Sequence, residues 1–137
     1  MLKIAKKNIR ESGLSGRISL LAGDVHDVPL PAGSVDLVVS RGSLFFWEDL
    51  ARAFSEIYRV LAPGGKTYIG GGFGTAELRD SIAAAMTTEN PDWKGFCDKN
   101  LGPENRARIV GVVAGLGLPH RIIYDDSGLW VMMEKGE

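Results

Sequence analysis

The side chains that most often carry enzyme chemistry are scarce in this sequence. His26 and His120 are its only histidines, and Cys97 is its only cysteine. These residues have neither the spacing of metal ligands nor that of a nucleophile paired with a base, so no metal centre or catalytic triad is predicted. For His26 two interpretations stay open, a general base and a hydrogen-bonded bystander. The bystander is favoured, because an isolated histidine is more often structural.

Groups that could bind a ligand stand instead where apolar runs end. Asp24 and Arg41 each close such a run. A carboxylate only accepts hydrogen bonds, and a guanidinium can hold a carboxylate through two parallel bonds. The aromatic run 45–47 follows Arg41, and Trp93 and Phe96 lie in a later connection. Each aromatic group could line an apolar substrate pocket or belong to the core, and core packing is the favoured interpretation for both.

Alternating apolar segments of strand and helix length must position these groups. Val35 to Ser40 is nearly continuous in apolar residues, which is typical of a strand buried on both faces. Strands separated by helices predict an α/β fold with a mostly parallel sheet, and a C-terminal hairpin adds an antiparallel strand at an edge. The predicted helices are 1–12, 49–61, 75–88 and 103–116; the predicted strands are 17–25, 35–40, 66–69, 120–124 and 129–133; segments 26–34 and 90–102 are predicted to be irregular.

Length and charge narrow the class of protein. The 137 residues suffice for one domain, and 16 basic against 17 acidic residues give a net charge of −1. That balance predicts no general attraction to nucleic acid or to an anionic membrane. No signal peptide or membrane-spanning run is recognisable, so a cytoplasmic location is expected.

Three segments, taken in order, resemble one known family. They are LAGDVHDVPL at 21–30, SVDLVVSR at 34–41 and AFSEIYRVLAPGGK at 53–66. Together they resemble the class I S-adenosylmethionine (SAM)-dependent methyltransferases, most closely those of ubiquinone and menaquinone biosynthesis. The resemblance is close over residues 1–73 and covers 103–135 only as a pattern of helix, strand and strand.

The resemblance implies a fold, a cofactor and a set of contacts. The family's strand order is 3-2-1-4-5-7-6 with strand 7 antiparallel, and residues 17–25, 35–40 and 66–72 match strands 3, 4 and 5. SAM is the implied cofactor, and methyl transfer to a small-molecule acceptor is the implied reaction. Asp24 and Val25 would meet the adenine, Ser40 and Arg41 the methionine portion, and Phe46 and Trp47 would bind the substrate, while no catalytic residue is implied.

The sequence also departs from the family. The strands that carry the glycine-rich SAM-binding turn and the ribose-binding acid should precede Met1, so we expect residues 1–137 to form a single truncated methyltransferase domain with an incomplete Rossmann-like sheet. Weak or absent SAM binding is expected for such a chain. Gly70, Gly72 and Gly74 follow a strand and precede a helix, as in a nucleotide-binding turn. However, Tyr68 stands where that turn has an acid, so glycines that open a strand into a loop are favoured.

An incomplete sheet would leave the inner edge of the strand at 35–40 unpaired. Buried backbone groups without partners are costly, so we expect strand 17–25 to shift onto that edge or a second copy of the chain to pair with it. A homodimer through the exposed sheet edge is the preferred expectation. The alternative to an enzyme is a non-catalytic dimeric module derived from the methyltransferase fold.

Overall fold

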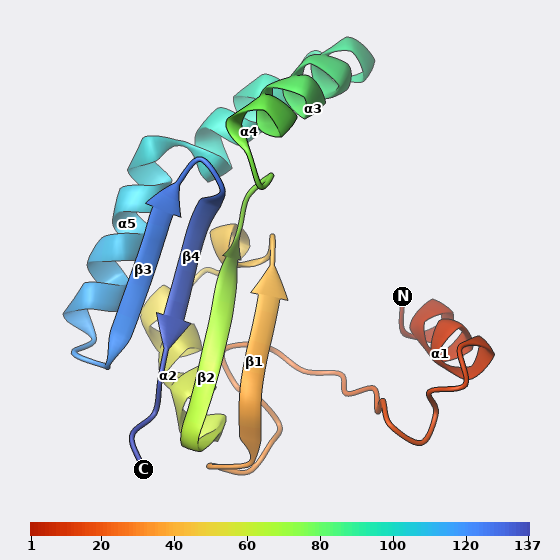
Figure 1. Cartoon of the computed structure of the whole chain (residues 1–137), viewed down its shortest axis with the longest axis vertical. Coiled ribbons are helices and arrows are strands. Elements are labelled where there is room, and N and C mark those ends of the chain that lie inside the picture. Colours follow the sequence, from red (N-terminus) through yellow and green to blue (C-terminus); the bar gives the residue numbers. More distant parts are fainter.

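Four strands form one mixed sheet in the computed structural model, which describes residues 1–137. Their order is β1-β2-β4-β3, with β1 parallel to β2 and both other pairs antiparallel. Figure 1 shows β1 at one edge and β3 at the other. The elements are α1 (Leu2–Glu11), β1 (Val35–Arg41), the 3-10 helix η1 (Leu44–Phe46), α2 (Leu50–Val60), β2 (Leu61–Gly71), α3 (Ala76–Glu89), α4 (Trp93–Leu101), α5 (Pro103–Gly115), β3 (His120–Asp125) and β4 (Gly128–Met133).

This topology confirms the α/β class and reproduces the family order 4-5-7-6. The antiparallel strand of the C-terminal hairpin, β4, lies between β2 and β3 and not at the edge that the hairpin pattern alone suggested. The sheet is mixed, because β1 and β2 are its only parallel pair.

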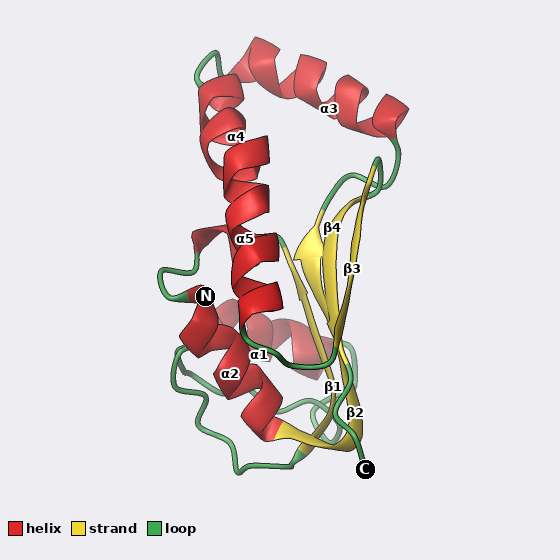
Figure 2. Cartoon of the chain, turned by 90° about the vertical axis from the view of Figure 1, so that its left-hand side faces the viewer, coloured by secondary structure: helices red, strands yellow, loops and turns green.

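The core lies between the sheet and the helices α2 and α5. Asp49 caps α2 by accepting a hydrogen bond from the Arg52 backbone N–H at 3.0 Å. One stripe of α2, including Phe54 and Ile57, is buried against Ile69 of β2 and the inner residues of β4. Figure 2 shows these helices on one side of the sheet and none on the other. On the uncovered face Leu37 is 60% and Val39 67% exposed.

The predicted strand at 17–25 does not form. Residues 18–23 have no regular structure, and only an isolated bridge joins Asp24 to Asp27. A strand persists only where a neighbour pairs with its backbone, and this segment does not shift onto the free edge of β1. The prediction from apolar residues alone was therefore wrong, and Ile18, Leu20 and Leu21 are exposed.

Two further boundaries differ from the predictions. The connection 90–102 contains α4, so the prediction of an irregular segment was wrong. The apolar residues of this segment have helical spacing, at Trp93, Phe96, Cys97 and Leu101. Gly95 lies among them and disfavours a helix, so the spacing was not recognised as helical. β2 begins at Leu61, five residues before the predicted start at 66, and its register to β1 shifts between Val35 and Leu37.

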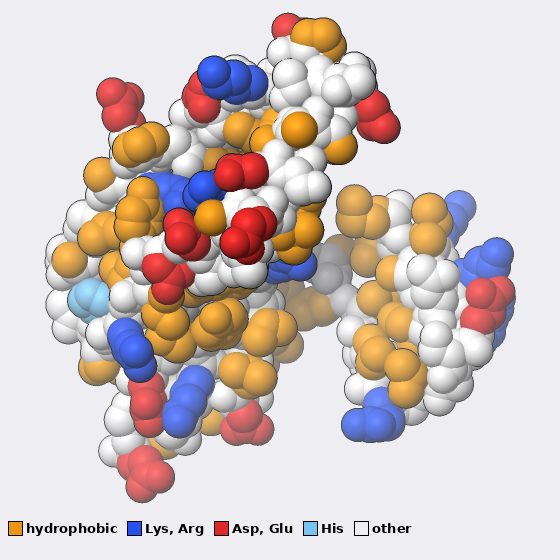
Figure 3. All heavy atoms as spheres, turned by 45° about the horizontal axis from the view of Figure 1, so that its top comes forward, with side chains coloured by type: hydrophobic (Ala, Val, Ile, Leu, Met, Phe, Trp, Pro, Cys, Tyr) orange, Lys and Arg blue, Asp and Glu red, His pale blue; other side chains and the backbone are white.

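The first helix lies outside the core. None of the residues of α1 is buried, and a long irregular segment leads from it to β1. In Figure 3 this N-terminal part stands apart at the right, with apolar side chains on its surface. No helix of the chain is long and apolar enough to cross a bilayer.

Candidate functional site

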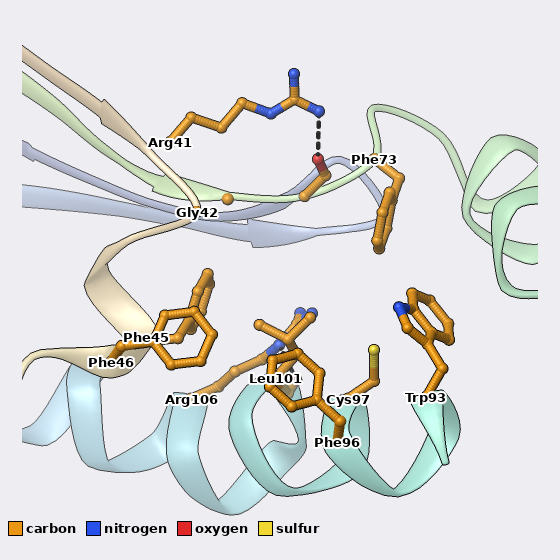
Figure 4. A pocket seen from close by; sticks show the side chains of 12 residues that line it. Arg41, Gly42, Phe45, Phe46, Phe73, Trp93, Phe96, Cys97, Leu101 and Arg106 are labelled. Carbon is orange, nitrogen blue, oxygen red and sulfur yellow. Dashed lines mark hydrogen bonds between the residues drawn. The ribbon is translucent and has the colours of Figure 1, made fainter. Parts of the chain in front are cut away.

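A cavity of about 400 Å³ opens beyond the carboxyl ends of β1 and β2. The crevice outside the carboxyl ends of parallel strands is the usual ligand site of α/β folds. Figure 4 shows strand ends and Arg41 on one side, and α4 and α5 on the other. The lining residues are Arg41, Gly42, Phe45, Phe46, Gly71, Gly72, Phe73, Trp93, Phe96, Cys97, Leu101 and Arg106.

Aromatic rings form most of the wall. The turn after β1 places Phe45 and Phe46, because Gly42 adopts a φ of +84° and its N–H donates to the Gly70 carbonyl at 2.7 Å. Phe45 is buried beneath the strand ends, close enough to Gly71 that a side chain there would collide with its ring. Phe46 is half-exposed and stacks on Phe96 of α4, with ring centroids 5.8 Å apart. The aromatic residues of two predicted clusters therefore meet in one cavity.

Arg41 is the predicted cofactor residue that borders this cavity, with its side chain on the side of the strand ends away from the aromatic rings (Figure 4). One of its terminal nitrogens donates to the Gly72 carbonyl at 3.1 Å, which holds the guanidinium across the ends of β1 and β2. Its remaining N–H groups have no acceptor in the chain. Ser40, one residue earlier, shares a hydrogen bond with Ser43 at 2.5 Å between the hydroxyl oxygens. Ser40 thus steadies the turn that carries the aromatic wall.

Asp24 and Val25 border a separate, smaller hollow of about 220 Å³. Asp24 Oδ1 accepts from the His26 backbone N–H at 2.8 Å and lies 2.6 Å from His26 Nδ1, while Oδ2 has no partner. These hydrogen bonds hold the pKa of the exposed Asp24 carboxyl below its usual value, and the bond from the His26 backbone N–H has the larger effect. Asp24 therefore presents an ionised oxygen that is free to accept a further hydrogen bond.

His26 joins that loop to the start of α2. Its Nε2 accepts from the Asp49 backbone N–H at 3.1 Å, so the ring proton is on Nδ1 and is donated to Asp24. Arg52 also donates to the His26 carbonyl, at 2.8 Å. With both ring nitrogens engaged, His26 has the bystander role that was favoured. His120 lies elsewhere, beside the Leu118 carbonyl.

Glu56 and Arg59 do more than form the exposed ion pair that their spacing predicts. Arg59 Nε donates to Glu56 Oε1 at 2.8 Å, and Glu56 Oε2 also accepts from the Val28 backbone N–H at 2.9 Å. Arg59 donates in turn to the carbonyls of Val28 and Leu30. The Arg59 guanidinium and then the Val28 N–H lower the pKa of Glu56 to about 2. The pair thus anchors the loop 26–34 to α2, which the spacing alone could not reveal.

Trp47 is not among the residues that line the cavity. Its ring packs edge-on against Phe54 of α2, with centroids 5.7 Å apart, and it adjoins the core. Of the two residues expected to bind the substrate, only Phe46 therefore faces the cavity.

Gly70 and Gly72 are explained by the hairpin that packs beside them. A Cβ on Gly70 would overlap the Leu129 carbonyl, and one on Gly72 would overlap the Ser127 carbonyl. These two glycines let β4 and its turn approach β2 closely, a role that was not predicted from the sequence. A nucleotide-binding turn is therefore not needed to explain these glycines.

Cys97, Leu101 and Arg106 are cavity residues that sequence reasoning missed. Cys97 and Leu101 belong to α4, a helix that was not predicted. Arg106 lies on α5, where the prediction rested on the apolar residues and not on this polar position. Burial, and then Asp98, raise the pKa of the Cys97 thiol, so it is a poor nucleophile near neutral pH. No three His, Cys, Asp or Glu side chains gather as metal ligands would.

Comparison with known proteins places these features in context. A family profile described as a methyltransferase domain matches residues 1–69. The uncharacterised methyltransferase YdaC of Bacillus subtilis strain 168 is 32% identical over 117 residues, which cover 76% of this chain and 60% of YdaC. The ubiquinone/menaquinone biosynthesis C-methyltransferase UbiE of Psychromonas ingrahamii is 30% identical over 69 residues, which cover 50% of this chain and 28% of UbiE.

Solved structures agree. A crystal structure of a proposed S-adenosyl-L-methionine-dependent methyltransferase from Methanococcus maripaludis is 52% identical, with a TM-score of 0.86 over 98% of this chain and 62% of that one. A SAM-dependent methyltransferase from Aquifex aeolicus has a TM-score of 0.61 at 16% identity, which supports the fold alone. The chain spans about three fifths of the length of YdaC and of the Methanococcus protein.

Proposed function

The chain belongs to the family of methyltransferase domains, and from that membership we propose that it transfers a methyl group from SAM to a small-molecule acceptor. The observation that carries the proposal is the cavity at the carboxyl ends of β1 and β2. In the sequence, the strand ends that border this cavity follow the segments that resemble the family. The relatives described above are all named as methyltransferases, so the non-catalytic alternative is not favoured.

Two pairs of residues, Asp24 and Val25 in the irregular segment before β1 and Ser40 and Arg41 at the end of β1, fit the chemical groups of SAM. The free Oδ2 of Asp24 suits an exocyclic amine, and the backbone of Val25 lies beside it. The unused N–H groups of Arg41 suit the carboxylate of an amino acid, and Ser40 steadies the adjoining backbone. When bound, SAM supplies a methyl group on a positively charged sulfonium.

The aromatic cavity suits the acceptor. Phe46 and its stacked partner Phe96 offer flat apolar surfaces to the cavity, and such walls exclude water from a bound molecule. Methyl transfer gains most from alignment of the reacting atoms and from exclusion of water. In this proposal the chain chiefly orients the two reactants and provides an apolar surface that keeps water from the acceptor.

Calorimetric titration of the full chain with S-adenosylhomocysteine tests cofactor binding. The sequence alone predicts weak or absent binding, but the free polar groups of Asp24 and Arg41 lead us to expect saturable binding to one site. Asp24→Ala should weaken it about tenfold or more, because hydrogen bonds to a charged group contribute about 1.5–3 kcal/mol. Asp27→Asn serves as the matched control, since Asp27 is exposed on the same loop and does not border the hollow. Absence of binding by the unaltered chain would contradict the proposal.

We further propose that the chain forms a homodimer through the free edge of β1. One side of β1 has no strand neighbour, and its outward residues Leu37 and Val39 are exposed and apolar. An unpaired, flat and apolar edge strand is a ready template for pairing with another chain. A second copy offers the same edge, which allows a two-fold symmetric interface.

A further inference from the structure

The cavity is positively charged as well as aromatic. Among its lining residues only Arg41 and Arg106 carry a charge, and no acidic residue faces it. The Arg106 side chain comes from α5 and lies among the aromatic residues, whereas Figure 4 draws the Arg41 side chain, from the end of β1, on the other side of the strand ends. A neutral apolar ligand would not need the Arg106 cation, so this charge indicates the class of ligand that the cavity binds.

Arg106 is held in place by contacts that leave its terminal nitrogens free. Its Nε donates to the Leu101 carbonyl at 2.6 Å, and its guanidinium carbon lies 5.3 Å from the centroid of the Tyr124 ring. No hydrogen bond uses either terminal nitrogen, and Figure 4 shows these nitrogens beside Leu101, directed towards the middle of the cavity. The half-buried side chain is thus oriented before any ligand arrives.

Two other arginines of this chain have acidic partners. Arg59 pairs with Glu56, and Arg79 reaches both Asp80 and Asp126. Arg106 forms no salt bridge with any carboxylate of the chain. A positioned, half-buried guanidinium without an anion is a binding group for a carboxylate or a phosphate, which it can hold through two parallel hydrogen bonds.

We propose that the acceptor joins a flat apolar body to an acidic group, with the rings of Phe46 and Phe96 against the body and Arg106 as the anchor of the acid. This inference rests on the proposed function, because it names the substrate class of that same cavity. Arg41 remains the partner proposed for the cofactor carboxylate, so each arginine meets a different anion.

The test compares two probes of the same shape. Binding of 2-naphthoate and of its neutral isostere 2-naphthamide to the full chain is measured by calorimetry. We expect the carboxylate to bind about tenfold or more tightly than the amide, as a charge-assisted pair implies. In Arg106→Gln this ratio should fall to about one, and in Arg106→Lys it should be intermediate, since lysine keeps the charge but loses the two-bond geometry.

Arg108→Gln is the matched control, because Arg108 lies on the same helix, is exposed and donates to Asn105 away from the cavity. It should keep the full preference for the carboxylate. Equal binding of the two probes, no binding of either, or a preference that survives in Arg106→Gln would each overturn the inference. Melting temperatures of all variants identify a loss that is due to unfolding, and in that case the Arg106→Lys result decides.

Titration of the same proteins with S-adenosylhomocysteine separates this inference from the proposed function. If S-adenosylhomocysteine binds and the naphthalene probes show no preference, the substrate class fails and the methyltransferase proposal stands. If the carboxylate is preferred but S-adenosylhomocysteine does not bind, the methyltransferase proposal fails, and the cavity is an anion-binding site without that reaction.

Discussion

Phe46 and Phe96 stack with their ring centroids 5.8 Å apart and their planes inclined by 24°. Phe46 ends the 3-10 helix that follows β1, and Phe96 lies in the middle of α4. Both rings are about half-exposed, and both line the cavity. The contact therefore links two distant parts of the chain at the wall of the proposed acceptor site.

A double-mutant cycle on this pair should reveal direct coupling. Stacked aromatic pairs contribute about 0.5–1.5 kcal/mol beyond the area that they bury, so Phe46→Ala and Phe96→Ala together should cost less than the sum of the single changes by about that amount. Urea unfolding of the four proteins measures the free energies. Strictly additive effects would mean that the rings do not stack in solution.

The Glu56 network should make part of the stability depend on acid pH. Glu56 has a pKa of about 2 in the folded chain against an ordinary value of 4.5, so its contribution is complete above about pH 4.5 and is lost as the pH falls towards 2. The difference in unfolding free energy between the unaltered chain and Glu56→Gln should therefore be constant at neutral pH and shrink over that range.

Urea unfolding at a series of pH values measures this difference. Glu48→Gln is the control, since Glu48 is exposed and has no hydrogen-bond partner, and it should leave the pH dependence of the unaltered chain intact. A difference that persists at pH 2 would show that the network does not involve the ionised carboxylate.

Two glycine-to-alanine changes should shift stability in opposite directions. Gly70→Ala places a methyl group against the Leu129 carbonyl, so the strands must separate, at a cost of about 2 kcal/mol or more. Gly111→Ala lies in α5 with open space around it, and should add about 0.5–1 kcal/mol, because alanine favours the helix. Thermal and urea unfolding measure both changes. A harmless Gly70→Ala would contradict the close approach of β2 and β4.

Light scattering of the purified chain tests the proposed dimer. We expect twice the monomer mass for the unaltered chain and the monomer mass for Val39→Lys, because a lysine on an edge strand opposes strand pairing. Leu78→Lys, an equally drastic change at an exposed position on α3, should leave the dimer intact. If the unaltered chain is monomeric at high concentration, this result would count against the edge interface.

Local patterns accounted for much of this fold. The apolar run 35–40 and the predicted helices 49–61 and 75–88 each correspond to an element that forms. The Thr75 hydroxyl caps α3 by accepting from the Leu78 N–H at 3.0 Å. The strand at 17–25 failed because its apolar residues say nothing of whether another strand lies beside them. α4 was not predicted because Gly95 disfavours a helix, although the aromatic residues on either side of it have helical spacing.

Residue type and spacing alone sufficed for the α/β class, since that class depends on periodicity. The resemblance of three segments added the methyltransferase family, and the binding roles that it implies for Arg41 and Phe46 stay predictions. Only the folded chain brought Phe96 and Arg106 to them and turned Trp47 into the core. The physical reason is that contacts across a cavity depend on how helices pack on the sheet. That packing is a property of the whole core, and no short segment encodes it.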